Sequence, residues 1–274
     1  SSSAASDVYK RQRHHTFFEM LGNFSFGDYF KEDAIQLAWD FITNELKLEK
    51  DRLWVTIFED DDEAASIWLE KIGVSADRLV RLGEKSNFWS MGDTGPCGPC
   101  SEVHYYVGDE VDNQIADGVN KSDQYWELGN IVFIQYNRIN DKSLVDLTSK
   151  HIDTGFGLER ISAILQGKNS NYDTDLFYPV IKEVESISNV PYADNGVSHR
   201  VIADHIRLLC FSIADGALPS NEGRGYVIRR ILRRASRFGR NIGLKKPFLH
   251  KMVKQIVKMM SDFYPELKER QKHI

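Results

Sequence analysis

The chain has 274 residues, of which 42% are hydrophobic, 27% charged and 11% aromatic, and its formal net charge is −5 at pH 7. This composition excludes a low-complexity disordered chain, and no apolar run reaches the roughly 20 residues that a membrane helix needs. The charge is unevenly distributed. Residues 1–198 contain 18 Lys/Arg and 34 Asp/Glu, a net of −16, whereas residues 199–274 contain 17 and 6, a net of +11. A basic segment on an acidic body indicates a nucleic-acid contact.

Hydrophobic periodicity and turn residues predict the elements in chain order. In the first part we expect a strand over 14–21 ending at Gly22, a helix over 29–46 capped by Asp28, a strand over 53–58 and a helix over 62–72. A Gly/Pro/Cys-rich loop over 92–99 then leads into a strand over 101–107 and a surface excursion over 108–123. A strand over 125–137, a strand end at 151–153 and a helix over 158–166 complete this part. Beyond Asn169, helical patterns cover 174–189, 199–214, 226–239 and 247–260. Because the strands do not alternate regularly with helices, this order predicts an α+β fold with an antiparallel sheet, followed by an all-helical part.

The two ends of the sequence lead us to expect a piece of a longer protein. Residues 1–12 (SSSAASDVYKRQ) resemble translated sequencing-adaptor read-through, and we set them apart from the fold. At the other end the helical pattern stops at Ile274 without a cap or breaker. An odd number of cysteines (three) and the lack of a signal-peptide pattern favour a reducing cytoplasm.

Cys97-Gly-Pro-Cys100 is a CxxC motif that three hypotheses can explain. A thioredoxin-type redox pair would need the first thiol at a helix N-terminus, but an alternating, strand-like run follows here. A zinc site with His104 as third ligand would still lack a fourth ligand. We favour a rigid loop against a substrate pocket.

Asp153-Thr-Gly-Phe-Gly-Leu-Glu-Arg160 predicts a nucleotide site. The two glycines allow a ligand to approach the backbone, and the N-terminus of the following helix favours negative charge. Arg160 would supply a permanently charged planar donor to a phosphate, or a surface for a base to stack on. Alone, the pattern is weak, because Gly-x-Gly before a helix is often only a turn.

The segment from Arg224 to Arg240 contains seven arginines and no acidic residue. Arginines recur at a spacing of four, while Ile228, Leu232 and Ala235 cover another side of the same helix. A helix with one buried face and one basic stripe is typical of a surface that binds a phosphate backbone. The alternative is a solvated helix face.

Several long stretches resemble the alanyl-tRNA synthetases, a family of class II aminoacyl-tRNA synthetases. They are RHHTFFEMLGNFSFGDYFK, NFWSMGDTGPCGPCSE, ELGNIVFIQYNR, HIDTGFGLER, NSNYDTDLF, RVIADHIR and PSNEGRGYVIRRILRRA. The resemblance covers essentially all of residues 13–274, in the family's order. It implies a class II antiparallel sheet (incomplete here) flanked by helices over 13–168, and a helical tRNA-recognition domain over 169–274.

The resemblance also implies site residues. Residues expected at ATP are His15, Phe18 (stacked on adenine), Trp89, Leu128, Gly129, Asn130, Gly157 and Arg160. Residues expected at alanine are Trp89, Asn130, Val132, Asp153 (which would hold the ammonium) and Gly155. Residues expected at the tRNA(Ala) acceptor stem are Asn221 (which would read its G·U pair), Arg224, Arg229, Arg230, Arg233 and Arg234. Asp153 and Arg160 are the expected catalytic pair.

The implied reaction is activation of L-alanine by ATP, followed by transfer to the 3′ end of tRNA(Ala). Such chemistry depends on positioning and on charge stabilisation by Arg and Mg²⁺ rather than on a protein nucleophile. The acids that would hold Mg²⁺ are not identified, and zinc is expected only in the family's editing domain. Motif 1 and the first half of motif 2 are expected upstream of Arg13, so we expect little activity from this fragment alone. The alternative is a non-catalytic tRNA-binding paralogue.

Overall fold

The computed structural model describes residues 14–140, 143–192 and 196–274. The chain divides into two compact units. The sheet unit is Glu19–Leu165, and the helical unit joins Gln166–Ile274 to the segment that ends at Phe18. The boundary predicted at residue 168 is thus close to a division between units, whereas the run predicted to be adaptor-like lies outside the described residues.

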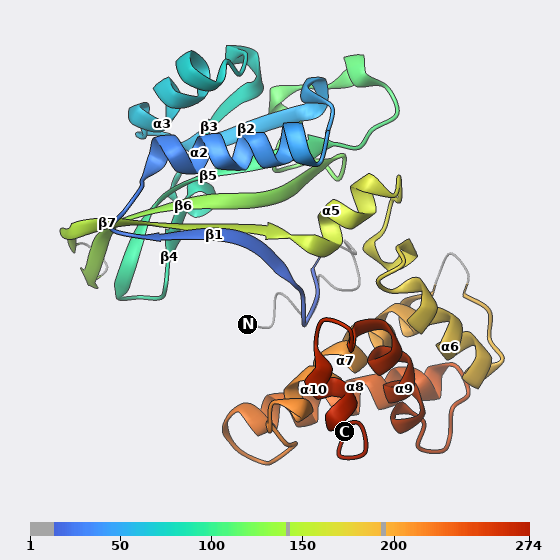
Figure 1. Cartoon of the computed structure of the whole chain (residues 1–274). Coiled ribbons are helices and arrows are strands. Elements are labelled where there is room, and N and C mark those ends of the chain that lie inside the picture. The colour runs from blue at the N-terminus through green and yellow to red at the C-terminus, as the bar shows by residue number, and fades with distance from the viewer. Residues whose placement is uncertain (1–13, 141–142, 193–195) are drawn as a thin grey trace. The chain divides into compact units, whose positions relative to one another are not determined.

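The sheet unit is built on a seven-stranded sheet. Its strands are β1 (Met20–Phe26), β2 (Leu53–Phe58), β3 (Leu79–Leu82), β4 (Phe88–Ser90), β5 (Gly95–Tyr106), β6 (Tyr125–Asn140) and β7 (Ser143–Gly157). They follow the order β1-β7-β6-β5-β2-β3, with β4 paired to β5 (Figure 1). All pairs are antiparallel except β2 with β3. The expected α+β class with an antiparallel sheet, followed in sequence by helices, is confirmed.

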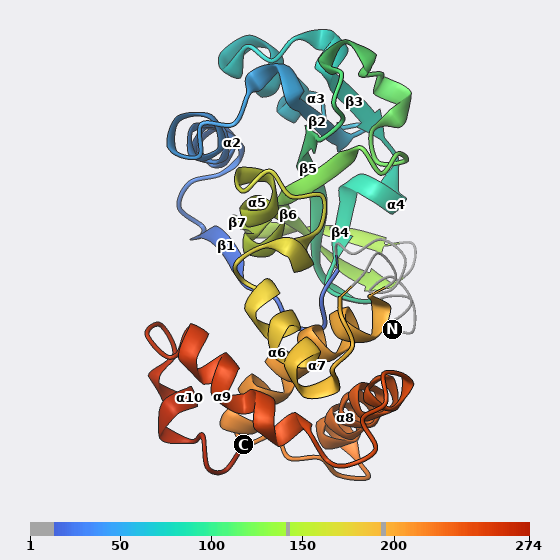
Figure 2. The same ribbon diagram turned by 90° about the vertical axis from the view of Figure 1, so that its right-hand side faces the viewer.

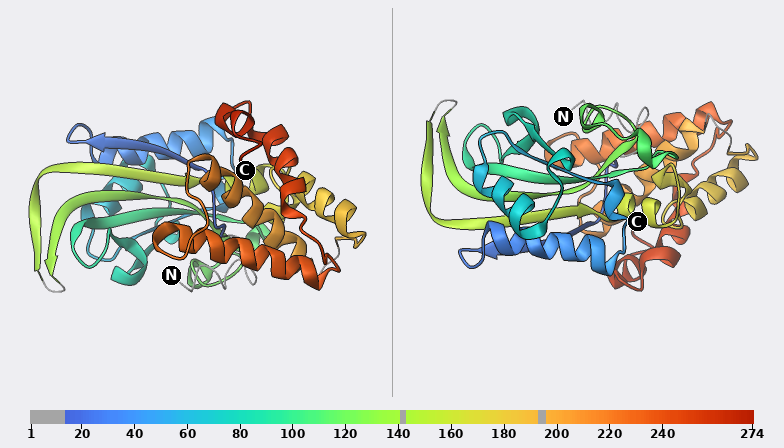
Figure 3. Two further views of the ribbon diagram at one scale, coloured as in Figure 1. Left: turned by 90° about the horizontal axis from the view of Figure 1, so that it is seen from below. Right: turned by 90° about the horizontal axis from the view of Figure 1, so that it is seen from above.

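β6 and β7 are the longest strands, and their paired ends reach beyond the neighbouring strands (Figure 3). Their pairing is irregular at two places, between Ile134 and Tyr136 and between Arg138 and Asn140. Such irregularities bend and twist a strand pair.

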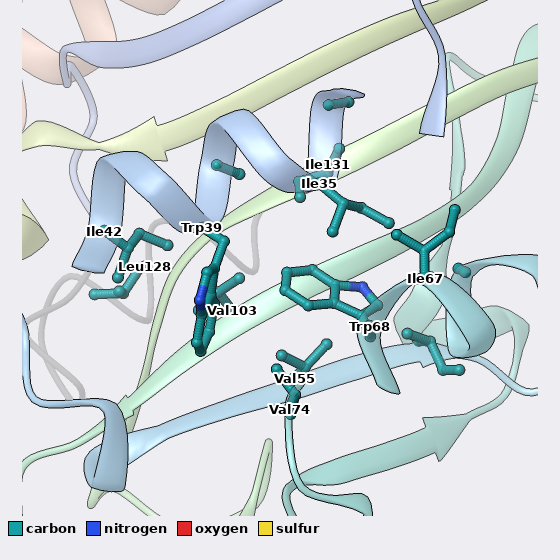
Figure 4. Close-up of a cluster of buried hydrophobic side chains, with 14 of the residues drawn as sticks. Ile35, Trp39, Ile42, Val55, Ile67, Trp68, Val74, Val103, Leu128 and Ile131 are labelled. Atoms are coloured by element: carbon teal, nitrogen blue, oxygen red, sulfur yellow. The ribbon is translucent and has the colours of Figure 1, made fainter. Parts of the chain in front are cut away.

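One face of the sheet carries the hydrophobic core of the unit, covered by α2 (Lys31–Asp40) and α3 (Asp62–Ser66), as Figure 1 shows. Figure 4 shows Ile35 and Trp39 of α2 directed toward Val103 and Ile131 of the sheet. All these side chains are buried. Alternate strand residues supply one side of this core and a helical 3–4 spacing supplies the other, which is the pattern that predicted both elements.

The helices expected over 29–46 and 62–72 are each an α-helix followed by a π-helix. α2 extends as the π-helix Phe41–Glu45, and α3 extends as the π-helix Ile67–Ile72, which ends at the left-handed Gly73. α4 (Glu84–Asn87) and 3-10 turns at Lys50–Arg52, Ala76–Arg78, Val111–Asn113 and Ala116–Gly118 complete the connections. The expected cap at Asp28 is wrong, because the helix begins after Phe30 without a side-chain cap.

The helical unit contains α6 (Tyr178–Ser188), α7 (Val197–Ala214), α8 (Gly223–Asn241), α9 (Leu249–Met260) and α10 (Pro265–Glu269), preceded by the 3-10 turn Asn171–Asp173. α7 is the central helix, since it contacts α6, α8, α9 and α10. In Figure 2, α8 and α10 lie on opposite sides of the unit. Among the described residues, no helix is both long and apolar enough to cross a membrane.

Two further sequence predictions about local structure are wrong. The expected strand over 14–21 begins only at Met20, because the backbone of Thr16 and the ring of His15 are hydrogen bonded to Asp204 of α7 instead of to a strand. The expected loop over 92–99 is strand from Gly95 onward, because β6 and β4 flank this segment and pair with it.

Candidate functional site

The face of the sheet opposite α2 is the polar face, and strand register fixes which residues share it. Residues opposite one another in antiparallel strands project to the same side. One row of paired residues crosses five strands: Gly22 of β1, Gly155 of β7, Asn130 of β6, Glu102 of β5 and Thr56 of β2. The next row is Phe24, Asp153, Val132 and Cys100. Residues 130, 132, 153 and 155, which the sequence analysis assigned to alanine, therefore lie side by side.

Asp153 is the half-buried acid of this face. Burial raises the pKa of its carboxyl above the ordinary value, because a charged group loses water there. No hydrogen bond or ion pair within the described residues compensates it. A carboxylate that is partly desolvated and left open is suited to hold a cationic group of a ligand.

α5 (Leu158–Leu165) starts directly after Gly157, so Arg160 stands on its first turn. Nη1 of Arg160 donates to the carbonyl oxygen of Glu127 at 2.7 Å and lies 3.1 Å from its Oε2. Glu159, 1% exposed, accepts the backbone N–H of Glu19 through both carboxylate oxygens, at 3.1 and 3.2 Å. The first turn of α5 is thus tied to the start of β1 and to the end of β6 that contains Glu127.

A bulge in β6 decides where Leu128 and Gly129 lie. Val103 pairs with Gly129 but the next residue, His104, pairs with Glu127, so Leu128 is the extra residue. Its side chain is fully buried in the core beside Ile42 (Figure 4). At Gly129 a Cβ would lie 2.1 Å from the carbonyl oxygen of Gly155. Neither residue therefore contributes a side chain to the polar face.

Trp89 and the CxxC motif adjoin this face. Trp89 of β4 is half-buried and pairs with Gly98, two residues before Cys100. Cys97 and Cys100 are buried free thiols within β5. Burial and the nearby Glu102 raise the pKa of the Cys100 thiol, which disfavours the reactive thiolate. No group of metal-ligating side chains suited to an ion occurs among the described residues.

A cavity of about 630 Å³ opens beside Lys31, Asp61, Phe88 and Arg138. It lies on the other side of β4 from Trp89, because Phe88 and Trp89 are successive strand residues and project in opposite directions. Lys31 is 4% exposed and lies 2.6 Å from Asp61. The cavity is therefore separate from the polar face.

In the helical unit, α8 presents the arginine stripe. Arg224, Arg229, Arg230 and Arg233 are exposed and Arg234 is half-buried, whereas Ile228 and Ala235 are buried. The predicted division of this helix into a basic and an apolar side is confirmed.

The turn before α8 brings Asn221 next to this stripe. Gly223 has a left-handed backbone, and a Cβ on Gly225 would lie 2.5 Å from the carbonyl oxygen of Leu218. Asn221 is exposed, and its Oδ1 accepts a hydrogen bond from Arg229. Amide and guanidinium are thus presented together, as donors and acceptors for a polar partner.

His15 is part of the helical unit, where it belongs to a buried polar cluster around Asp204. Its Nδ1 lies 3.1 Å from Asp204 Oδ1, its Nε2 lies 2.8 Å from Asn171 Nδ2, and its ring stacks on Phe177. Burial by itself would raise the pKa of the Asp204 carboxyl, but hydrogen bonds from His15 and His205 outweigh it and hold that pKa well below its usual range. The side chain of His15 is 2% exposed, and that of Phe18 is half-exposed.

Comparison with known proteins identifies the family. Residues 5–274 match the family model described as "tRNA synthetases class II (A)". The chain belongs to this family. It is 55% identical over 269 residues to the alanine–tRNA ligase of Lawsonia intracellularis, a match that covers 96% of the chain and 30% of that protein. It is similarly 54% identical to the alanine–tRNA ligase of Magnetococcus marinus and 56% to that of Idiomarina loihiensis, covering 31% and 30% of those proteins. The chain spans about a third of the length of these curated relatives.

In this member of the class II tRNA synthetases, the strand residues expected to bind alanine lie on one face of the sheet. Arg160 lies on α5, the helix that follows β7. His15 is instead buried within the helical unit, and the side chain of Leu128 is in the core. The roles predicted for these residues at ATP stay predictions. Sequence reasoning missed Glu102 and Glu159. Glu159 could have been found, because it is an acid in a helix whose other buried residues are apolar. Glu102 could not, because it alternates with the core residue Val103 as a surface residue would.

Proposed function

We propose that the chain carries the aminoacylation centre of an alanine–tRNA ligase. The polar face of the sheet unit would activate L-alanine with ATP, and α8 would bind the acceptor stem of tRNA(Ala). The observation that supports this most is the side-by-side arrangement of Asp153, Asn130 and Val132 on two paired strands, with Arg160 one helical turn beyond the end of β7.

In this proposal Asp153 holds the ammonium of alanine and directs its carboxylate toward the α-phosphate of ATP. The carboxylate oxygen forms a bond to phosphorus, pyrophosphate leaves, and an alanyl-adenylate results. Arg160 would contact the nucleotide, since a guanidinium stabilises charge that develops on phosphate. The terminal ribose hydroxyl of the tRNA then attacks the acyl carbon, and adenylate leaves.

The side chains present suit a small amino acid. Val132 is 2% exposed, and with Trp89 it would leave room for little more than a methyl group. A wall of this kind discriminates by only about 10- to 200-fold between substrates that differ by a methylene or a hydroxyl. Glycine and serine would therefore still be activated at a reduced rate.

Mg²⁺ would neutralise phosphate charge in this reaction. It prefers oxygen ligands and commonly uses one or two carboxylates together with the phosphates. Glu127 suits this role, because its carboxylate lies beside Arg160 and its side chain is 34% exposed. In the resting protein the same carboxylate pairs with Arg160, and binding of the nucleotide would separate them.

The test is alanine-dependent exchange of pyrophosphate into ATP, combined with titration of tRNA(Ala) into the chain. We expect ATP and tRNA(Ala) to bind, and D153N to abolish the alanine dependence of any exchange. D146N, a change of an exposed acid on the same strand, is the matched control. Binding of tRNA(Ala) without any binding of ATP or alanine would instead favour the non-catalytic paralogue.

A further inference from the structure

Glu102 of β5 is a carboxylate on the polar face to which no role has been assigned. It pairs in register with Asn130, which pairs in turn with Gly155. It is 9% exposed, in contrast to most acids of the sheet unit, which are at the surface. Burial of a charged group is costly unless partners compensate it.

The two oxygens of this carboxylate are in different situations. Oε2 accepts a hydrogen bond from Thr56 Oγ1 at 3.3 Å and lies 3.1 Å from Nε2 of His104, which is 1% exposed. Thr56 is held in turn by Asn87, whose Nδ2 donates to its hydroxyl at 3.0 Å. Both hydrogen bonds therefore use Oε2, and Oε1 has no hydrogen-bond partner within the described residues.

A carboxylate fixed through one oxygen and open at the other is a prepared acceptor. Its neighbours on the polar face are Asn130 in the same row and Asp153 in the next row, one strand beyond Asn130. An α-ammonium group has three N–H donors, and Asp153 with Asn130 offers acceptors from only two strands. Glu102 offers one from a third strand.

We propose that Glu102 is a second carboxylate of the ammonium site and accepts a hydrogen bond from the α-ammonium of the bound amino acid. The proposal rests on the proposed function, because it takes the ligand of the polar face to be an amino acid. His104 and Thr56 act as positioning residues, since they fix Oε2 and thereby the direction of Oε1. The pair of carboxylates would select for a free ammonium and against acyl groups that lack one.

The test compares two ligands that differ only in this group. One is the sulfamoyl analogue of alanyl-adenylate, and the other is its propionyl counterpart, in which hydrogen replaces the ammonium. Calorimetric titration of the 274-residue chain gives the wild-type preference for the first ligand. We expect E102Q to reduce that preference about 10-fold or more, because a charge-assisted hydrogen bond is lost. E110Q, which changes an exposed acid of the same unit, should keep it.

The outcomes separate the two levels of the proposal. A folded E102Q protein that keeps the wild-type preference overturns the role of Glu102 but leaves the proposed function standing. A wild-type chain that binds neither analogue overturns both. Should E102Q not fold, the wild type labelled with ¹³C-glutamate gives the answer. The Glu102 carboxylate signal should shift with the alanyl analogue and not with the propionyl analogue, and equal shifts with both would contradict the proposal.

Discussion

The polar face and the arginine stripe of α8 are built in opposite ways. The stripe is local, because a spacing of four residues in one helix is sufficient to align its arginines. The polar face is non-local, because its residues come from five strands and are aligned only by strand register. The stripe is exposed and repetitive, so single changes should have small effects. The sheet beneath the polar face depends on a few close approaches of its strands, so a single change at one of those approaches should have a large effect.

The largest expected effect tests whether the helical unit, unlike its arginine stripe, depends on contacts between residues that are distant in the sequence. D204N should lower the free energy of unfolding of this unit by about 3–5 kcal/mol, because it removes the charge of a buried hydrogen-bonded network. Urea unfolding followed by circular dichroism measures this. D215N, at an exposed position at the end of α7, is the control. A D204N protein as stable as the control would mean that the helices pack without this network.

The same carboxyl predicts a pH dependence. Because the folded pKa of Asp204 lies below its ordinary value, its contribution is complete above the ordinary carboxyl pKa and is lost as the pH falls through the folded pKa. On acidification the wild type should therefore lose more of its stability than D204N does. Parallel stability–pH curves for the two proteins would contradict this assignment.

The next largest effect tests the close approach of β5 and β6 in the sheet unit. At Gly98 a Cβ would lie 1.8 Å from the carbonyl oxygen of Phe133, so G98A must push β5 from β6. We expect a loss of about 1–3 kcal/mol in the free energy of unfolding. G92A is the matched control, since the nearest atom to its added Cβ is 3.9 Å away. Equal melting temperatures for the two variants would show that the strand pair adjusts freely.

Single changes in the stripe should act on RNA binding and hardly on stability. R229A or R233A should weaken binding of an RNA acceptor stem by about threefold to tenfold and reduce the salt dependence of binding by about one phosphate contact. Titrations at several salt concentrations measure both. K85A removes an exposed cation from the sheet unit and serves as control. An unchanged salt dependence in both arginine variants would exclude the stripe from the RNA interface.

The smallest expected effect is a gain in stability, whereas D204N and G98A should each cause a loss. Because burial raises the pKa of Asp153, its charged form is less stable in the folded state than in water. Stability should fall slightly as the pH rises above the ordinary carboxyl pKa, and D153N should remove that fall. We expect a gain of less than about 1 kcal/mol at neutral pH, since water screens a half-exposed group. Thermal melting of D153N beside D146N measures it, and a lower melting temperature for D153N alone would contradict the reading.

Particular residues show how far the sequence could predict the fold and the site. The strand at 53–58 and the helices at 199–214 and 247–260 were predicted nearly to their ends, because their apolar periodicity is local. The start of β1 was not, because His15 and Thr16 bind Asp204, almost 200 residues away in the chain. Leu128 was expected at the pocket, and only the bulge in β6 turns it into the core.

By itself the sequence determined the α+β order of elements, the family, and the basic stripe of α8. Each of these depends on residue type and short spacing. The tertiary structure decided which side chains share the polar face, and it brought Glu102 next to Asn130. The physical reason is that strand pairing joins distant segments, and a single extra residue in one strand changes which side chains lie on the polar face and which lie in the core.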